Sequence, residues 1–173
     1  MIIQIIFLVF LIFALFWFLS LLIAAYSGAP TIYSKDKIIK KALYAVNLNK
    51  NQKIVDFGCG NGRVLIIASR GFGARGVGVE ISPFYYLLAK LNVLFSGESK
   101  NIKIYFGNIR DHEKLVNGAD VVYLYLLDKI MRKIEPWIFN ALKKNTKIIS
   151  ITFPFKNHKG QVYDGPPKIY IYN

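Results

Sequence analysis

The first 26 residues form an almost unbroken apolar run. Between Met1 and Tyr26 only Gln4 and Ser20 fall outside the apolar set. A helix needs about 20 apolar residues to cross the hydrocarbon core of a bilayer, so this run predicts a transmembrane helix. The alternative is a secretory signal peptide, for which residues 27–29 offer small side chains. A signal peptide has a basic start and an apolar stretch of about 7–15 residues. This sequence has no Lys or Arg at its start, and its apolar run is longer.

Beyond this run, short apolar stretches alternate with segments of helical spacing. Strand-like runs lie at 53–57, 76–81, 102–106, 121–125 and 147–152, and helical patterns lie at 35–47, 63–70, 83–95, near Glu113 and at 129–142. We expect Ser34 to cap the first of these helices and Ser82 with Pro83 to start the third. A Gly-rich segment at 71–76 leads to the second strand, and residues 161–172 are expected to form a hairpin or edge strands. The alternation predicts an α/β fold with a Rossmann-like, mainly parallel sheet covered by helices on both faces.

Composition and charge divide the chain at the same place. Residues 1–34 carry no charged side chain, so the 23 Lys+Arg and 10 Asp+Glu that give a net charge of +13 all lie beyond them. Without the apolar run the hydrophobic fraction falls from 54% to roughly 47%, which is typical of a globular domain. We therefore expect a transmembrane helix at 1–26, a linker at 27–34 and one domain at 35–173.

The charge after the apolar run predicts its orientation. Lys35, Lys37, Lys40 and Lys41 follow the run closely, and basic flanks stay on the cytoplasmic side. We expect a single-pass protein of the cell membrane with a cytoplasmic domain, whose first lysines lie near an anionic lipid surface. The net charge would also suit nucleic acid. The basic residues are scattered without interleaved aromatics, however, which favours lipid over nucleic acid.

A glycine-rich loop separates the first strand-like run from the next helix. Residues 56–63 read Asp-Phe-Gly-Cys-Gly-Asn-Gly-Arg, and such a loop lets a ligand approach the backbone and the helix N-terminus. The spacing G-x-G-x-G differs from the dinucleotide fingerprint, and no Lys-Ser/Thr pair completes a phosphate loop. Glu80 ends the second strand 22 residues beyond Gly58, near the separation expected of an acid that holds ribose hydroxyls. A solvent-facing glutamate is the alternative for Glu80.

These motifs resemble those of class I S-adenosylmethionine-dependent methyltransferases. The resemblance rests on residues 56–62 and on Gly76-Val77-Gly78-Val79-Glu80. It implies S-adenosylmethionine as the cofactor, with Asp56 near its amino group, Glu80 on the ribose and Asn108 near the adenine. The full set of cofactor-binding residues that it implies is Asp56, Gly58, Cys59, Gly60, Asn61, Gly62, Glu80, Ile81, Asn108 and Ile109.

A narrower resemblance covers nearly the whole chain. The order of features is similar to that of membrane-anchored protein-lysine methyltransferases that modify the ATP synthase c-subunit and the adenine nucleotide translocase. It comprises the membrane segment, Pro30 to Ser34, the glycine loop, Glu80 and a late Phe153-Pro154-Phe155. Tyr33 and Asn108 depart from the family's usual proline and aspartate. The resemblance implies N-methylation of a lysine in a membrane-protein substrate.

Methyl transfer to lysine requires alignment and a neutral amine. An apolar or aromatic channel disfavours the ammonium form and lowers the lysine pKa. Residues after the fourth and fifth strands open at the ligand-bearing edge, and we expect Tyr125, Asp128, Phe153 and Pro154 to act in catalysis. The same positions include Tyr123 and Phe155, for which a place in the core is the favoured interpretation.

Other functions are weighed against this interpretation. His112 and His158 are isolated, which indicates no metal site, and the Asn/Asp-Pro-Pro-aromatic motif of many base methyltransferases is absent, which argues against nucleic acid. Two alternatives stay open: a methyltransferase for a lipid, quinone or other apolar small molecule, and a non-catalytic S-adenosylmethionine-binding membrane protein.

Overall fold

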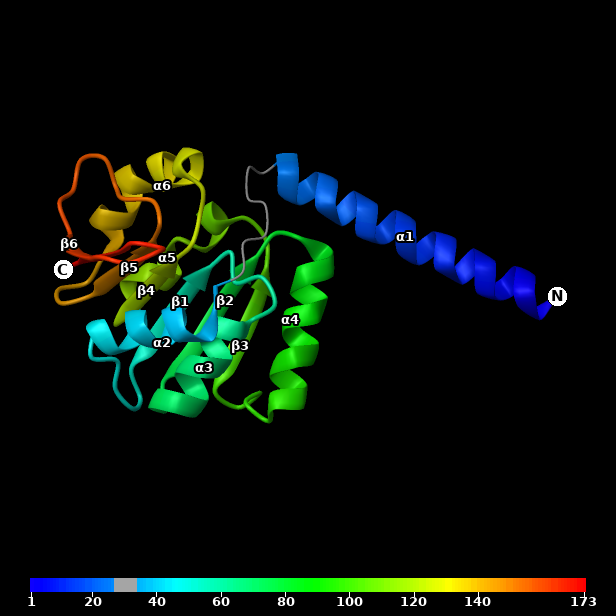
Figure 1. The fold of residues 1–173 in the computed structure, drawn as a ribbon, viewed down its shortest axis with the longest axis horizontal. Helices are drawn as coiled ribbons and strands as arrows, with labels where there is room; N and C mark the ends of the chain where they lie inside the picture. Colours follow the sequence, from blue (N-terminus) through cyan, green and yellow to red (C-terminus); the bar gives the residue numbers. More distant parts are fainter. Residues whose placement is uncertain (27–33) are drawn as a thin grey trace.

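A long apolar helix projects from an α/β domain (Figure 1). The computed structural model describes residues 1–26 and 34–173, so most of the predicted linker, Pro30 and Tyr33 included, lies outside the described residues. Helix α1 spans Ile2–Tyr26. Its segment Ile2–Ile23 has a mean hydropathy of 3.0 and is long and apolar enough to cross a membrane, by length and composition.

The domain is built on a seven-stranded sheet in the order β3-β2-β1-β4-β5-β7-β6. The first five strands are parallel neighbours, and β7 runs antiparallel to both β5 and β6. The strands are β1 Lys53–Phe57, β2 Arg75–Glu80, β3 Ile102–Phe106, β4 Val121–Leu124, β5 Lys147–Ile151, β6 Gln161–Tyr163 and β7 Ile169–Tyr172. The central strands are rich in Val and Ile because both faces of a parallel sheet are covered.

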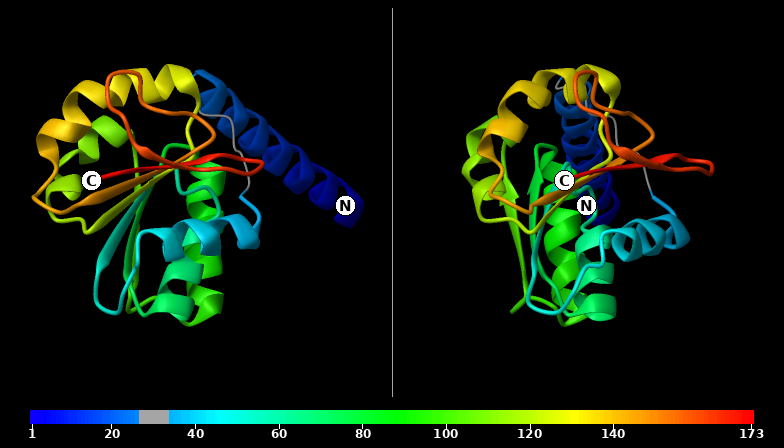
Figure 2. Two further views of the ribbon diagram at one scale, coloured as in Figure 1. Left: turned by 60° about the vertical axis from the view of Figure 1, so that its left-hand side comes forward. Right: turned by 90° about the vertical axis from the view of Figure 1, so that its left-hand side faces the viewer.

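Helices cover both faces of the sheet, and each face has its own apolar core (Figure 2). Helices α2, Asp36–Ala45, α3, Arg63–Phe72, and α4, Pro83–Ser96, contribute to one face. Helices α5, Lys114–Asn117, and α6, Asp128–Ala141, contribute to the other, and a 3₁₀ turn at Ile109–His112 precedes α5. Alternate residues of β1 point to opposite faces, so that Ile54 packs into the first core and Val55 into the second. The Rossmann-like fold expected from the sequence is confirmed.

Two local predictions were wrong. Ser34 does not cap α2: Lys35 holds the N-cap position without a side-chain hydrogen bond, and the Ser34 hydroxyl lies 3.2 Å from the Tyr123 hydroxyl. The Gly-rich segment between the second helix and the second strand is shorter than the predicted 71–76, because α3 continues to Phe72 and β2 already begins at Arg75. Gly73, with φ of 66°, ends α3 instead. A left-handed residue just past the last turn is the usual end of a helix.

Helix α1 contacts the domain at the start of α4. The Ser20 hydroxyl lies 2.6 Å from the Ser82 hydroxyl and accepts a hydrogen bond from the Phe84 backbone N–H at 3.0 Å. The Phe84 ring packs against Phe13 and Trp17, with centroid distances of 6.3 and 6.5 Å. Ser82 also caps α4, as expected, by accepting a hydrogen bond from the Tyr85 N–H. The N-terminus of α4 therefore connects α1 to the α/β domain through these hydrogen bonds and ring contacts.

Candidate active site

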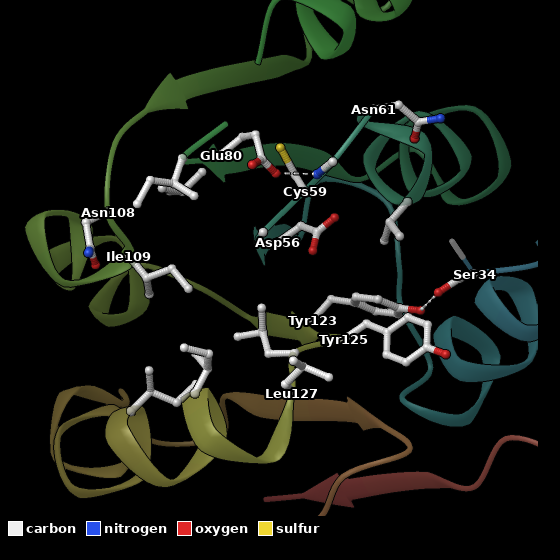
Figure 3. A pocket seen from close by; sticks show the side chains of 18 of the residues that line it. Ser34, Asp56, Cys59, Asn61, Glu80, Asn108, Ile109, Tyr123, Tyr125 and Leu127 are labelled. Atoms are coloured by element: carbon white, nitrogen blue, oxygen red, sulfur yellow. Dashed lines mark hydrogen bonds between the residues drawn. The ribbon is translucent and has the colours of Figure 1, made fainter. Parts of the chain in front are cut away.

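A cavity of about 430 Å³ opens at the carboxyl ends of the parallel strands. Residues that end or follow β1, β2, β3 and β4 line it, and α6 closes one side (Figure 3). The strands β1 and β4 are neighbours in the sheet, although the chain continues from β1 to β2 on the other side. Ligands of open α/β sheets bind at such a switch in strand order.

The glycine loop forms one wall of this cavity. Gly58 and Gly62 have φ values of 77° and 78°, and side chains rarely adopt this left-handed region. A Cβ on Gly58 would also lie 3.0 Å from the Leu126 side chain. Gly58, Cys59, Gly60 and Asn61 line the cavity, whereas Gly62 lies behind them as the N-cap of α3. Burial raises the pKa of the Cys59 thiol, which keeps the thiol protonated.

Glu80 is held in place by backbone donors at the end of β2. One carboxylate oxygen accepts a hydrogen bond from the Gly60 N–H and the other from the Ser82 N–H, both at 2.8 Å. The residue is only 7% exposed. Burial raises its pKa, although these backbone N–H groups oppose that shift. The fixed carboxylate retains lone pairs toward the cavity, which suits two neighbouring ligand hydroxyls.

Asp56 presents a second buried carboxylate to the same cavity (Figure 3). It is 3% exposed, and no described residue donates a hydrogen bond to its side chain. Burial, with a smaller effect of Glu80, raises the pKa of Asp56 from 3.8 to about 8. A buried carboxylate without a partner is costly. A ligand ammonium group beside Asp56 would supply the partner that this buried carboxylate needs.

Ile81, which follows β2, and Asn108 and Ile109, which follow β3, line the next part of the cavity. The Asn108 side-chain oxygen accepts a hydrogen bond from the Arg110 N–H at 3.0 Å and so starts the 3₁₀ turn. An amide oxygen has two lone pairs, so one remains for a ligand amine. Ile81 and Ile109 supply apolar surface on which a planar ring could pack.

Aromatic hydroxyls line the end of the cavity next to β4. Tyr125 follows β4 and is half-buried, and the Tyr123 side chain is almost fully buried. The Tyr123 hydroxyl pairs with Ser34, and burial raises its pKa, so the phenol stays neutral. These residues lie close to Asp56 in Figure 3. The arrangement provides a neutral, hydrogen-bonding entrance beside the carboxylate.

Three of the predicted catalytic residues are not among the described residues that line the cavity. Asp128 forms an ion pair with Arg132 one turn along α6. Phe153 and Pro154 follow β5 on the side of β7, where the Phe153 carbonyl accepts a hydrogen bond from the Ser150 hydroxyl. Phe155 lies in the core against Tyr172, as favoured from the sequence.

The sequence pattern did not reveal the apolar lining that α6 and its preceding loop contribute. These side chains are Leu126, Leu127, Ile130 and Ile134. Their signal was the helical spacing of Ile130 and Ile134, which sequence alone cannot separate from ordinary core packing. They add apolar surface to the cavity, and Leu126 packs next to Gly58 of the glycine loop.

The residues present fit S-adenosylmethionine. The cofactor carries an amino acid group, a ribose and an adenine, and the cavity offers the unpaired Asp56 carboxylate, the oriented Glu80 carboxylate and the Asn108 amide in that order. No group of three or more His, Cys, Asp or Glu within the described ranges is placed to hold a metal ion.

Comparison with known proteins agrees with this geometry. Residues 56–161 match the family model of the ANTKMT methyltransferase domain. A protein-lysine N-methyltransferase of Saccharolobus islandicus (strain REY15A) is 27% identical over 128 residues, which cover 73% of this chain and 78% of that protein. A ribosomal protein L11 methyltransferase of Vibrio cholerae is 34% identical over 90 residues, but this match spans only 30% of that longer protein.

Solved structures share the same fold. An RNA methyltransferase from Salinibacter ruber, in complex with S-adenosyl-L-homocysteine, is 26% identical with a TM-score of 0.78, covering 82% of this chain and 92% of that one. A precorrin-6y C5,15-methyltransferase from Geobacter metallireducens has a TM-score of 0.68 at 15% identity and supports the fold alone.

Proposed function

The chain belongs to the family of ANTKMT methyltransferase domains, and we propose that it N-methylates a lysine of a membrane protein at the cytoplasmic surface. It is an S-adenosylmethionine-dependent methyltransferase of the protein-lysine type. The observation that carries the proposal is the pair of buried carboxylates, Asp56 and Glu80, which face one cavity within the segment that matches the family.

Different residues of the chain would bind and orient the cofactor. The bound cofactor supplies an electrophilic methyl group on a sulfonium. Asp56 would pair with the cofactor's ammonium group, and Glu80, which the Gly60 N–H holds in place, would bind the ribose hydroxyls. Because methyl transfer is an in-line displacement, these contacts act by alignment.

The lysine must arrive as a neutral amine. Tyr123, Tyr125, Leu126 and Ile130 line the same cavity as Asp56. This surrounding disfavours a second ammonium ion and so lowers the lysine pKa. The bound cofactor would transfer its methyl carbon to this neutral nitrogen and leave as the thioether S-adenosylhomocysteine, and the methylated ammonium would release one proton to solvent.

The membrane location rests on α1 and its flank. The segment Ile2–Ile23 has a mean hydropathy of 3.0, and Lys35, Lys37, Lys40 and Lys41 follow it. Basic residues beside a span favour the cytoplasmic side. A substrate lysine near the same membrane surface would then lie within reach of the anchored domain.

A fractionation experiment tests the substrate class. Membranes that contain the protein are incubated with radiolabelled S-adenosylmethionine and separated into protein and lipid. Label is expected in a protein band, and Glu80→Ala should abolish it. Label confined to extracted lipid would instead support the small-molecule alternative, and cofactor binding without any labelled product would support a non-catalytic binding protein.

RNA methylation is the second candidate, because the similar Salinibacter ruber protein is named as an RNA methyltransferase and this chain carries a net charge of +13. The sequence after β4, Tyr125-Leu126-Leu127-Asp128, lacks the motif typical of base methyltransferases. Treatment of the same reaction with ribonuclease separates the two candidates, since it would remove the label only if RNA is the acceptor.

A further inference from the structure

The outer face of α4 carries an unusual row of exposed apolar side chains. Leu87, Leu91, Leu94 and Phe95 are 49%, 49%, 61% and 81% exposed. Within the same helix, Ala89 and Val93 are buried toward the sheet. Large apolar side chains grouped on one surface mark a site of interaction.

These side chains lie in line with the contact between α4 and α1. Phe84, Leu87, Leu91 and Phe95 are spaced by three or four residues, so they share one face of the helix. Phe84 begins this row, and its ring packs against Phe13 and Trp17 of α1. The exposed apolar side chains of α4 therefore lie on the same face of the helix as its contact with α1.

The directions of the two helices suit a bilayer. Figure 1 shows α1 and α4 diverging from their contact, with α1 leaving the domain and α4 running along its edge. When α1 crosses a membrane, a helix that diverges steeply from it runs along the membrane surface. An amphipathic helix in this position buries its apolar face at the boundary of headgroups and acyl chains.

A flanking cation fits the same arrangement. Lys90 lies on α4 between Leu87 and Leu94, is exposed, and holds its ammonium 5.7 Å from the centre of the Tyr86 ring. A lysine at the edge of an apolar face can extend its charge to lipid phosphates while its stem stays in the apolar layer.

We propose that the bilayer itself is the partner of this surface: the α4 face formed by Phe84, Leu87, Leu91, Leu94 and Phe95 lies in the cytoplasmic lipid interface beside α1. The inference rests on the proposed membrane location of α1. It adds that contact with lipid fixes the orientation of the domain relative to the membrane. Glu80 lies just before α4, so the cofactor cavity would then sit at a fixed height above the lipid.

Spin-label accessibility in lipid vesicles tests this arrangement. Single cysteines replace Leu91, Phe10 and Lys144 in the full chain, and each label is exposed to oxygen, which concentrates in lipid, and to a water-soluble nickel complex. Lys144 is the control, as an exposed residue between α6 and β5. The unsubstituted chain, whose Cys59 is buried, gives the background. We expect the oxygen-to-nickel ratio to be several-fold higher at Leu91 and Phe10 than at Lys144.

The three labels distinguish the ways in which this proposal can fail. A high ratio at Phe10 with a Lys144-like ratio at Leu91 would overturn the α4 proposal and leave the anchor intact. Low ratios at both positions would overturn the anchor and the α4 proposal together. A Leu91 label shielded from both reagents, with shielding lost on dilution of the protein in lipid, would show that a second copy covers α4 and would overturn the lipid proposal.

Discussion

The hydroxyl of Ser20, within the long apolar helix, lies 2.6 Å from the hydroxyl of Ser82, two residues after Glu80. Both serines are 1% exposed. The Ser82 N–H in turn donates to the Glu80 carboxylate, which also accepts from Gly60. A continuous set of hydrogen bonds therefore links α1 to the proposed ribose-binding residue.

Ser20→Ala should loosen this link without removing the helix from the membrane. The Phe84 N–H and the Ser82 hydroxyl would lose their shared partner, at a cost of about 1–3 kcal/mol to the contact. Labels at positions 10 and 91 should then give a broader distance distribution by pulsed electron paramagnetic resonance. Ser20→Thr keeps the hydroxyl and serves as the control. An unchanged distribution in the alanine variant would show that the hydrogen bonds do not fix α1.

Glu80→Gln should weaken cofactor binding by about tenfold or more, because the site loses a charged acceptor for neighbouring hydroxyls. The amide can still accept one of the two backbone N–H groups, so the fold should persist. Isothermal titration with S-adenosylmethionine measures the change. Asp164→Asn alters an exposed carboxyl group and should bind as the native chain does. Equal affinities for the two variants would show that Glu80 does not bind the cofactor.

Asp56 should make cofactor affinity depend on pH. Its pKa is raised to about 8, so the ligand-free site holds a proton below that pH and must release it to pair with an ammonium group. Affinity should therefore rise between pH 6 and 8, with proton release detectable by calorimetry in buffers of different ionisation enthalpy. Asp56→Asn should bind more weakly and lose this dependence. A native affinity that stays constant over this range would contradict the assignment.

The same shift has a consequence for stability. Between its ordinary value of 3.8 and about 8, Asp56 is protonated in the folded chain and ionised in the unfolded one. The folded state then binds the extra proton, so this group's contribution to the free energy of unfolding falls as pH rises through that window. At pH 8 without cofactor, Asp56→Asn should melt at a higher temperature than the native chain. A lower melting temperature would contradict the raised pKa.

Tyr125 and Asp128 are both predicted catalytic residues, but only Tyr125 lines the cavity. Tyr125 lines the cavity, whereas the Asp128 carboxylate pairs with Arg132. Tyr125→Ala should reduce turnover by about tenfold or more while the affinity for S-adenosylmethionine changes little. Tyr44→Ala, at an exposed tyrosine of α2, is the matched control. Asp128→Asn should leave turnover near native, and a large loss there would restore Asp128 as a catalytic residue.

The sequence predicted the sheet well because its signals were strong and local. β1 and β3 have the predicted bounds, and Ser82 with Pro83 marked the start of α4 correctly. The predicted ends of helices and strands were less accurate next to glycines. Gly71 was placed after the helix that ends at residue 70, but it lies inside α3, because one glycine costs a helix only about 1 kcal/mol.

The site was predictable where backbone motifs define it and less so where tertiary packing does. Asp56, Gly60 and Glu80 follow from a loop and a strand end, and the structure brings them to one cavity. The role of Ser34 was missed, because its hydroxyl meets Tyr123 across 89 positions of sequence. The contact of Ser20 with Ser82 was likewise missed. Local patterns carry no information on such distant pairs.

Quantitative mass spectrometry of membranes tests the central claim most directly. Membranes from cells that produce the native chain are compared with membranes from cells that produce Glu80→Ala at the same level. We expect a methylated lysine in a membrane protein, close to the cytoplasmic end of a transmembrane span. This modification should be present with the native chain and absent with the variant. Identical methyl-lysine profiles, with a difference confined to lipid or RNA, would contradict it.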